Sequence, residues 1–186
     1  MREAAGEVLA LARSRPPTLG RGRLVCVDGP AGAGKTSLAA ALEPAGARVV
    51  HMDDLYDGWD GLPRVDTQLE TLLRPMAAGA EGHYRRYDWL AAGWAETVTV
   101  PPGPLLVVEG VGAWAPAVAD LVTVLVWVEA PPDLRLSRGL ARDGEGMRRE
   151  WVAWMAQEEE HLARTGARAR ADVRVDGRSG TVVAAG

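Results

Sequence analysis

The chain has 186 residues, 47% of them hydrophobic, and a formal net charge of -4. This length and composition predict one domain with a substantial core, and the acidic balance argues against a general nucleic-acid surface. No stretch approaches the roughly 20 apolar residues of a membrane span, and residues 1–5 lack the layout of a signal peptide, so we expect a cytoplasmic protein that binds neither membranes nor nucleic acids.

Residues 1–20 are predicted to form an N-terminal helical appendage. Val8 and Leu11 lie among charged residues in a pattern typical of a short amphipathic helix. Pro16 and Pro17 then break that helix before the first strand begins.

The most informative segment is a strand, a loop and a helix in direct succession. The apolar run at residues 24–27 predicts a buried strand, and residues 37–42 predict a helix. Between them, residues 29–36 read GPAGAGKT and match the pattern G-x-x-x-x-G-K-[ST] at every fixed position. Lys35 of this pattern is the only lysine of the chain, in which twenty arginines supply every other side-chain cation.

A loop of this kind binds the phosphates of a nucleoside triphosphate. Its amides and the following helix N-terminus converge on phosphate oxygens, and the expected binding residues are Gly29, Ala31, Gly32, Ala33, Gly34, Lys35, Thr36 and Ser37. The Lys35 ammonium is expected to reach the β- and γ-phosphates, and the Thr36 hydroxyl to ligate Mg²⁺. The expected cofactors are therefore ATP and Mg²⁺; the alternative is a glycine-rich turn that only resembles the motif.

An acidic segment follows the second predicted strand, residues 47–52. Asp53, Asp54, Asp57 and Asp60 place four carboxylates at the carboxyl edge of that strand. Asp53 is the expected general base, which orients an acceptor hydroxyl, takes its proton, and contacts Mg²⁺ through water. The alternative for Asp57 and Asp60 is an acidic surface turn.

The next elements supply a second carboxylate. Residues 65–78 include a helix that we expect to stop or kink near Pro75, and residues 104–109 form a third strand that ends at Glu109. A carboxylate at that strand end is expected to hold the Mg²⁺ shell, with an ordinary strand-end acid as the alternative. Residues 121–128 are an almost continuous apolar run and predict a fourth buried strand.

A charged helical region covers residues 133–164. Arg135, Arg138 and Arg142 recur at three- and four-residue spacing and share one helix face. We expect residues 132–150 to act as a lid that closes over the phosphates and supplies cations for the transition state. The alternative is a solvated helix face paired with nearby acids.

Strands that alternate with helices predict a three-layer α/β architecture for a single domain, residues 1–186. Its mainly parallel sheet is expected to have five strands, the last at residues 172–175, followed by a C-terminal tail at residues 177–186. The active site belongs at the carboxyl ends of the strands.

With these features in order, the chain resembles the uridine kinase-like branch of P-loop kinases, which also contains nicotinamide riboside kinase, pantothenate kinase and phosphoribulokinase. The similarity covers roughly residues 22–176 and includes the stretch at residues 87–89 followed by residues 96–100. The resemblance implies a P-loop NTPase fold with a helical lid. It also implies that Asp53 is the catalytic aspartate, that Glu109 lies near Mg²⁺, and that Arg138 and Arg142 are catalytic lid arginines.

The same resemblance implies an acceptor site. Asp60 matches an aspartate that binds ribose hydroxyls, and Tyr56 and Tyr87 are expected at the acceptor pocket. Where uridine and cytidine kinases carry a histidine and an arginine after Tyr-Asp-Phe, this chain has residues 90–94, LAAGW. Their hydrogen bonds to a pyrimidine are therefore missing.

The resulting expectation is an ATP-dependent kinase that transfers the γ-phosphoryl group to a hydroxyl of a nucleoside or nucleoside-like acceptor. One alternative is a nucleoside monophosphate kinase, in which Arg85 and Arg86 bind the acceptor phosphate, or a kinase for another small alcohol. An alternative of another class is an ATP-binding switch or accessory NTPase. Kinases of this branch often assemble as oligomers, which leaves a homo-oligomer open.

Overall fold

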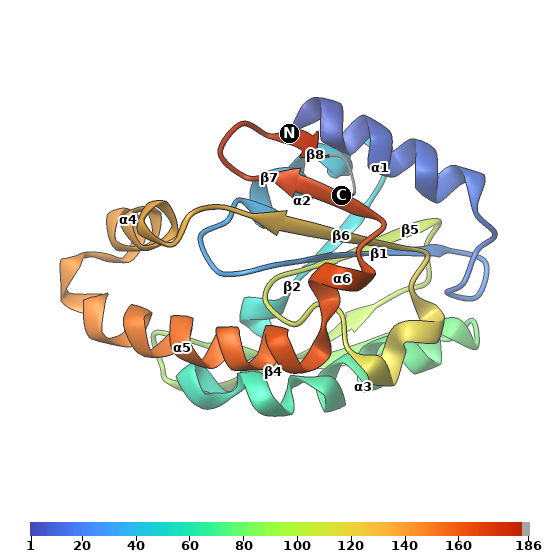
Figure 1. Ribbon diagram of the computed structural model, residues 1–186. Helices are drawn as coiled ribbons and strands as arrows, with labels where there is room; N and C mark the ends of the chain where they lie inside the picture. Colours follow the sequence, from blue (N-terminus) through green and yellow to red (C-terminus); the bar gives the residue numbers. More distant parts are fainter. Residues whose placement is uncertain (184–186) are drawn as a thin grey trace.

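The computed structural model describes residues 1–183 as a three-layer α/β domain (Figure 1). The central sheet contains β1 (Arg23–Asp28), β2 (Arg48–His51), β5 (Leu105–Glu109), β6 (Val124–Glu129), β7 (Val173–Asp176) and β8 (Thr181–Val183). A separate antiparallel hairpin consists of β3 (Gly82–Asp88) and β4 (Gly93–Val100). The helices are α1 (Arg2–Ser14), α2 (Lys35–Leu42), α3 (Val65–Ala77), α4 (Pro132–Asp143), α5 (Arg148–Thr165) and α6 (Ala167–Arg170).

The central sheet has the order β2-β5-β1-β6-β7-β8, and its first five strands are parallel. This confirms the predicted α/β class and the mainly parallel sheet, but the sheet has six strands instead of five. The sixth, β8, pairs antiparallel with β7 and lies within the segment expected to be a tail. The last three residues of that predicted tail, 184–186, lie outside the described part.

Alternating side chains of the strands bury two faces. On one face Leu24 and Cys26 of β1 pack with residues of α3 and α5, and on the other Val25 and Val27 pack with α1 and α2. Because both faces are covered, the central strands β1, β5 and β6 are almost continuously apolar, as is typical of parallel sheets.

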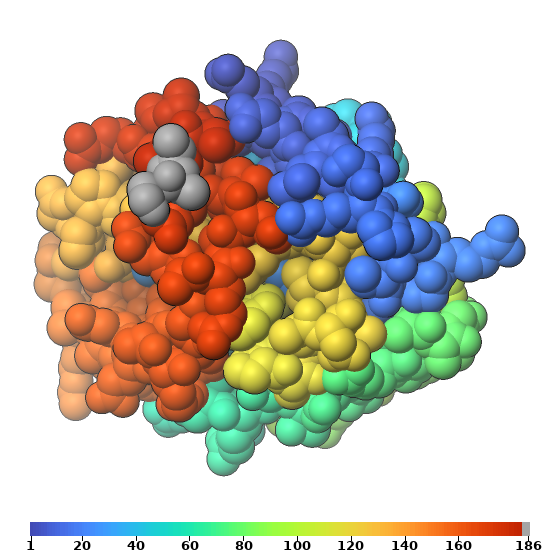
Figure 2. Space-filling model, turned by 45° about the vertical axis from the view of Figure 1, so that its right-hand side comes forward, coloured from blue at the N-terminus to red at the C-terminus, as the bar shows by residue number. Residues whose placement is uncertain are grey.

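Helix α1 is part of a layer and not an appendage. Ala4 and Val8 are fully buried in the cluster that contains α2, and the Met1 ammonium donates a hydrogen bond of 2.9 Å to the Gly180 carbonyl oxygen. Figure 2 shows the blue N-terminal helix against the red C-terminal segment. The small alanines on its inner face explain why the pattern predicted the helix but not its burial.

Two predicted helical regions differ in detail. Pro75 lies inside α3, which continues to Ala77, and the charged region at residues 133–164 is divided into α4 and α5. Gly144 makes the break with φ of +97°, a conformation that L side chains rarely adopt. No helix of the described residues combines the length and apolarity required to cross a membrane.

Candidate active site

The predicted phosphate-binding loop lies between β1 and α2, at the carboxyl edge of the sheet. Its glycines are required for close backbone contacts as well as for conformation. Gly29 has φ of +135°, and a Cβ there would lie 2.1 Å from the Val128 carbonyl oxygen. Gly32 has φ of +74°, and a Cβ there would lie 2.6 Å from the Arg135 carbonyl oxygen. The loop is therefore packed tightly between β6 and α4.

Lys35 reaches back across this loop. Its ammonium donates hydrogen bonds of 2.7 Å to the Gly29 carbonyl oxygen and 2.8 Å to that of Pro30. Burial lowers the pKa of Lys35, and nearby carboxylates, foremost Glu109 and Glu158, oppose that effect. The ammonium is thus held inside a preformed loop and surrounded by acids that favour its charged form.

Two of the three predicted metal-site residues, Thr36 and Glu109, lie together, and the third, Asp53, lines the same cavity. The Thr36 hydroxyl donates a hydrogen bond of 3.0 Å to Oε1 of Glu109, and the Glu109 side chain is buried at the end of β5. His51, which pairs with Glu109 in the sheet register, places Nδ1 2.6 Å from the same oxygen. This hydrogen bond is the main cause of a raised pKa for His51.

These oxygens fit the requirements of Mg²⁺. The ion prefers hard oxygen ligands, and it usually takes one or two from the protein and the rest from substrate phosphates and water. Within residues 1–183, no group of three or more His, Cys, Asp or Glu side chains is placed to hold a metal ion by itself. The donor set of Thr36 and Glu109 therefore fits an ion that arrives with the nucleotide.

Asp53 lies just after β2 in the short turn Met52–Asp54. It lines the same cavity as Lys35, Thr36 and Glu109, and its carbonyl oxygen accepts a hydrogen bond of 2.9 Å from the Trp89 indole. Asp53 keeps part of its surface exposed to solvent. Partial desolvation of its carboxylate and, second, repulsion from Glu109 raise the pKa of Asp53, while Lys35 opposes both effects. The structure thus places the expected base beside the phosphate-binding loop.

The cavity has a volume of about 660 Å³ and opens above the loop. Of the predicted site residues it brings together Ala31, Gly32, Gly34, Lys35, Thr36, Asp53, Tyr56, Glu109, Arg138 and Arg142. Three other residues predicted to bind the nucleotide do not line the cavity. Gly29 and Ala33 are buried within the loop, and Ser37 is exposed.

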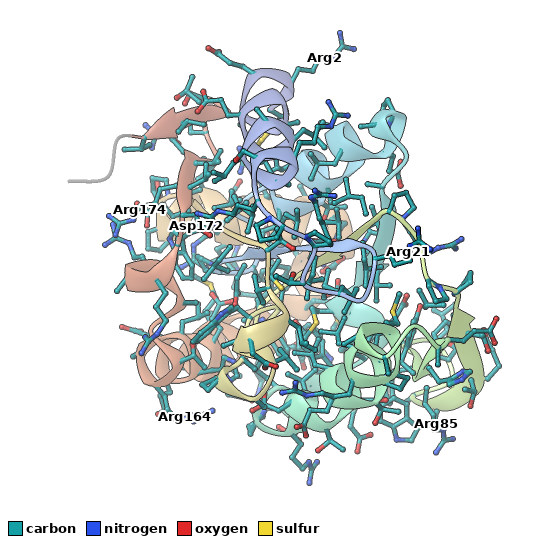
Figure 3. The ribbon with its side chains drawn as sticks, turned by 90° about the vertical axis from the view of Figure 1, so that its right-hand side faces the viewer. Arg2, Arg21, Arg85, Arg164, Asp172 and Arg174 are labelled. Atoms are coloured by element: carbon teal, nitrogen blue, oxygen red, sulfur yellow. The ribbon has the colours of Figure 1, made fainter. Side chains whose placement is uncertain are left out.

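The predicted lid arginines have different positions along α4. Arg138 donates hydrogen bonds of 3.1 Å to the carbonyl oxygens of Gly32 and Gly177. Arg142 forms a two-bond pair with Asp143 and lies over the ring of Trp151, 5.7 Å from its centroid. Both line the cavity, in contrast to arginines such as Arg2 and Arg21, which point outward from the surface (Figure 3).

Three predicted acceptor residues do not join this cavity. Arg86 forms a two-bond ion pair with Glu96 of the neighbouring strand, which occupies its guanidinium. Tyr87 packs edge-on against Trp89 and Trp94, and Asp60 is exposed outside the lining. The structure therefore separates these three residues from the loop and Asp53.

Asp28 is a site residue that the sequence argument missed. It is fully buried and accepts hydrogen bonds from the amides of Gly29 at 2.7 Å, Gly112 at 2.9 Å and Trp114 at 3.0 Å. Desolvation raises the pKa of Asp28 to about 6, against the opposite effect of these amides. Its signal in the sequence is a carboxylate at the end of an apolar strand, directly before the motif.

Glu158 of α5 is the second missed residue. Its Oε2 accepts a hydrogen bond of 2.7 Å from the Ala31 amide, and its Oε1 lies 2.6 Å from Nη1 of Arg135. Arg135 in turn donates to the Ala31 carbonyl oxygen at 3.2 Å. The third arginine of the predicted lid face therefore holds the loop backbone and does not reach the cavity.

No protein-family model and no curated protein matches the sequence. Solved structures are similar along most of the chain. A proposed uridine kinase from Bacillus stearothermophilus is 21% identical with a TM-score of 0.57, over 82% of this chain and 88% of that one. A proposed fructose transport system kinase from Silicibacter sp. TM1040 is 20% identical with a TM-score of 0.58, over 90% and 94%. The YGR205w protein is 10% identical with a TM-score of 0.52, over 88% of each chain.

At these identities the similarity establishes the fold. The chain has the P-loop NTPase fold that the uridine kinase-like resemblance implied, with the loop at the carboxyl ends of the strands and α4 beside it. Fold alone does not determine chemistry, so the function is argued from the cavity.

Proposed function

We propose that the protein is an ATP-dependent, Mg²⁺-requiring kinase that transfers the γ-phosphoryl group of ATP to a hydroxyl of a small nucleoside-like acceptor. The observation that carries this proposal is the position of Asp53, which lines the same cavity as Lys35 and Thr36 of the phosphate-binding loop. A carboxylate next to a triphosphate site is suited to orient an alcohol for attack. The structural neighbours described as proposed kinases point to the same reaction class.

In the proposed reaction Asp53 orients the acceptor hydroxyl and takes its proton while the hydroxyl oxygen attacks the γ-phosphorus. A bond forms between these two atoms, and the bond from the γ-phosphorus to the bridging oxygen breaks, so that ADP leaves. Lys35 and Arg138 supply positive charge for the equatorial oxygens of the transition state. Arg142, with Trp151, bounds the cavity on the side of α4 and limits the access of water that would otherwise accept the phosphoryl group.

Thr36 and Glu109 are the residues that would hold Mg²⁺. When bound, this ion neutralises charge on the phosphate oxygens. Glu109 is kept in position by the Thr36 hydroxyl and by His51.

The alternative of a nucleoside monophosphate kinase receives less support. It requires a cation at the acceptor end of the cavity, and Arg86 is instead paired with Glu96 outside the lining. The alternative of an ATP-binding switch predicts nucleotide binding without transfer to a small alcohol.

A coupled ADP-release assay with Mg·ATP tests the proposal. The panel consists of nucleosides, nucleoside monophosphates, pantothenate, sugars, amino alcohols and aryl alcohols. Stimulation by an alcohol, absent in Asp53→Asn, is the expected result. Binding of ATP without stimulation by any member of the panel would favour the switch.

A further inference from the structure

The cavity has two halves of different chemistry. Its ionic half consists of the loop, Glu109 and the arginines of α4. Its other half is formed by the aromatic side chains of Tyr56, Trp59, Trp89, Trp151 and Trp154, which we call the aromatic wall. The chain has ten aromatic residues and no phenylalanine, so half of all its aromatic rings line this one cavity. Tyr56 and Trp154 also belong to the buried core, with Trp59 packed against it, whereas Trp89 is exposed.

The aromatic wall is assembled from three parts of the chain. Tyr56 and Trp59 follow β2, Trp89 directly follows β3, and α5 supplies Trp151 and Trp154. The rings of Tyr56 and Trp154 are 5.0 Å apart, those of Trp154 and Trp59 are 5.8 Å apart, and those of Trp59 and Trp89 are 5.3 Å apart. Four of the five rings are therefore supported by a neighbouring ring, and Trp151 is held by its hydrogen bond to Asp143, which fixes the wall before a ligand binds.

The wall offers few polar groups to a ligand. The Tyr56 hydroxyl is buried and donates to the Val111 carbonyl oxygen at 2.6 Å. The indole N–H of Trp89 donates to Asp53, and that of Trp151 to Asp143 at 2.9 Å. Among the described residues that line the cavity there is no Asn, Gln, Ser or His side chain. The indole N–H groups of Trp59 and Trp154 are the two polar groups of the wall that donate no hydrogen bond to the described residues. A polyhydroxylated or amide-rich ligand would lose more hydrogen bonds to water there than these two donors replace.

We infer that the aromatic wall binds an aromatic ring of the acceptor by its face and apolar surface, and that the acceptor class is aryl alcohols. It narrows the nucleoside-like acceptor of the proposed function to an alcohol whose aromatic ring carries few polar groups. The transfer to the hydroxyl rests on the proposed kinase function, whereas the binding of the ring does not. Asp53 adjoins both halves, because it lines the cavity with Lys35 and Glu109 and its carbonyl oxygen accepts the hydrogen bond from the Trp89 indole. A ring on the wall would thus direct its hydroxyl substituent toward Asp53 and the loop, and polar substituents on the ring edge would contribute little to affinity.

Calorimetric binding of 2-phenylethanol, 2-cyclohexylethanol and uridine to the whole protein tests this inference. Because an aromatic side chain stacks favourably on an aromatic ring, we expect 2-phenylethanol to bind roughly tenfold or more tightly than the other two. Tighter binding of uridine, or equal binding of the phenyl and cyclohexyl compounds, would overturn it.

Substitutions locate the ring. Trp59→Leu is expected to weaken 2-phenylethanol binding by roughly tenfold and to leave ATP binding unchanged. Trp94→Leu is the matched control, because Trp94 packs on Tyr87 outside the cavity lining, and it should retain wild-type affinity. If Trp59→Leu does not fold, Trp89→Leu replaces it, since Trp89 is 39% exposed. Unchanged affinity in the folded variant would overturn the inference.

The same titrations separate this inference from the proposed function. Saturable binding of 2-phenylethanol without ADP release would contradict the kinase and support the ring site. ADP release with uridine but no binding of 2-phenylethanol would support the kinase and overturn the ring site.

Discussion

Glu158 accepts a hydrogen bond of 2.7 Å from the amide of Ala31, which joins helix α5 to the phosphate-binding loop across 127 residues of sequence. The other oxygen of Glu158 pairs with Arg135 of α4. One buried carboxylate therefore connects the loop with both helices that flank the cavity, and the loop conformation depends on it.

Glu158→Ala is expected to destabilise the protein by about 3–5 kcal/mol, because it leaves the buried Arg135 guanidinium unpaired. Urea unfolding measures this change. Glu159→Ala is the matched control, since Glu159 is exposed on the same helix, and it should change stability by less than about 0.5 kcal/mol. Equal effects of the two substitutions would show that the Ala31 contact does not hold the loop.

Asp28→Asn is expected to cost about 1–3 kcal/mol at neutral pH, because the new amide group faces backbone donors that it cannot all satisfy. The pKa of Asp28 is raised from 3.8 to about 6, so the folded state binds the proton more tightly than the unfolded state. The contribution of Asp28 to the free energy of unfolding of the wild type therefore falls as the pH rises from 3.8 to about 6, by at most about 1.4 kcal/mol per pH unit.

The asparagine variant has no such titration. The stability gap between wild type and Asp28→Asn should thus be larger near about pH 4.5 than near about pH 7, as measured by urea unfolding at both values. A gap that does not change with pH would contradict the raised pKa.

Gly139→Ala tests the packing of α4 against α5. A Cβ at this position would lie 2.4 Å from ring atoms of Trp151, so the two helices must move apart, at a cost of about 1–3 kcal/mol. Because Gly139 also lines the cavity, we expect a raised KM for ATP. Gly146→Ala meets no atom within 4 Å and should leave both thermal stability and KM unchanged; the same KM change in that control would refute the packing argument.

Asp53→Asn tests the general base. Loss of the proton acceptor is expected to lower kcat by roughly 10²–10⁴-fold, while calorimetric binding of Mg·ATP is retained. Asp57→Asn is the control in the same acidic segment, because Asp57 is exposed and lies 3.8 Å from Arg64. Activity that survives in Asp53→Asn would remove the base from the mechanism.

Much of the fold could be predicted from the sequence because its signals are local. The apolar strands, the loop and the helix after it lie within short segments, and parallel strands bring their carboxyl ends together whatever their order. This is why Thr36 and Glu109, 73 residues apart, were expected near each other and lie within hydrogen-bonding distance.

The remaining features depend on contacts between distant segments. Nothing in the sequence around Glu158 indicates its contact with Ala31. Strand β8 has only three residues, too few to show the residue alternation that predicts a strand. The hairpin was not recognised, so the pairing of Arg86 with Glu96 on the neighbouring strand was missed. The seven tryptophans were visible in the sequence, but the assembly of four of them, with Tyr56, into one wall follows only from the tertiary structure.

The most direct test of the proposed kinase follows the fate of the γ-phosphoryl group. The protein is incubated with ATP labelled at the γ-phosphate, Mg²⁺ and the best acceptor of the panel, and the products are separated. We predict that the label appears in a phosphate ester of the acceptor, in amounts equal to the ADP formed, and that Asp53→Asn abolishes it. Label found solely in inorganic phosphate would contradict the account and identify an NTPase.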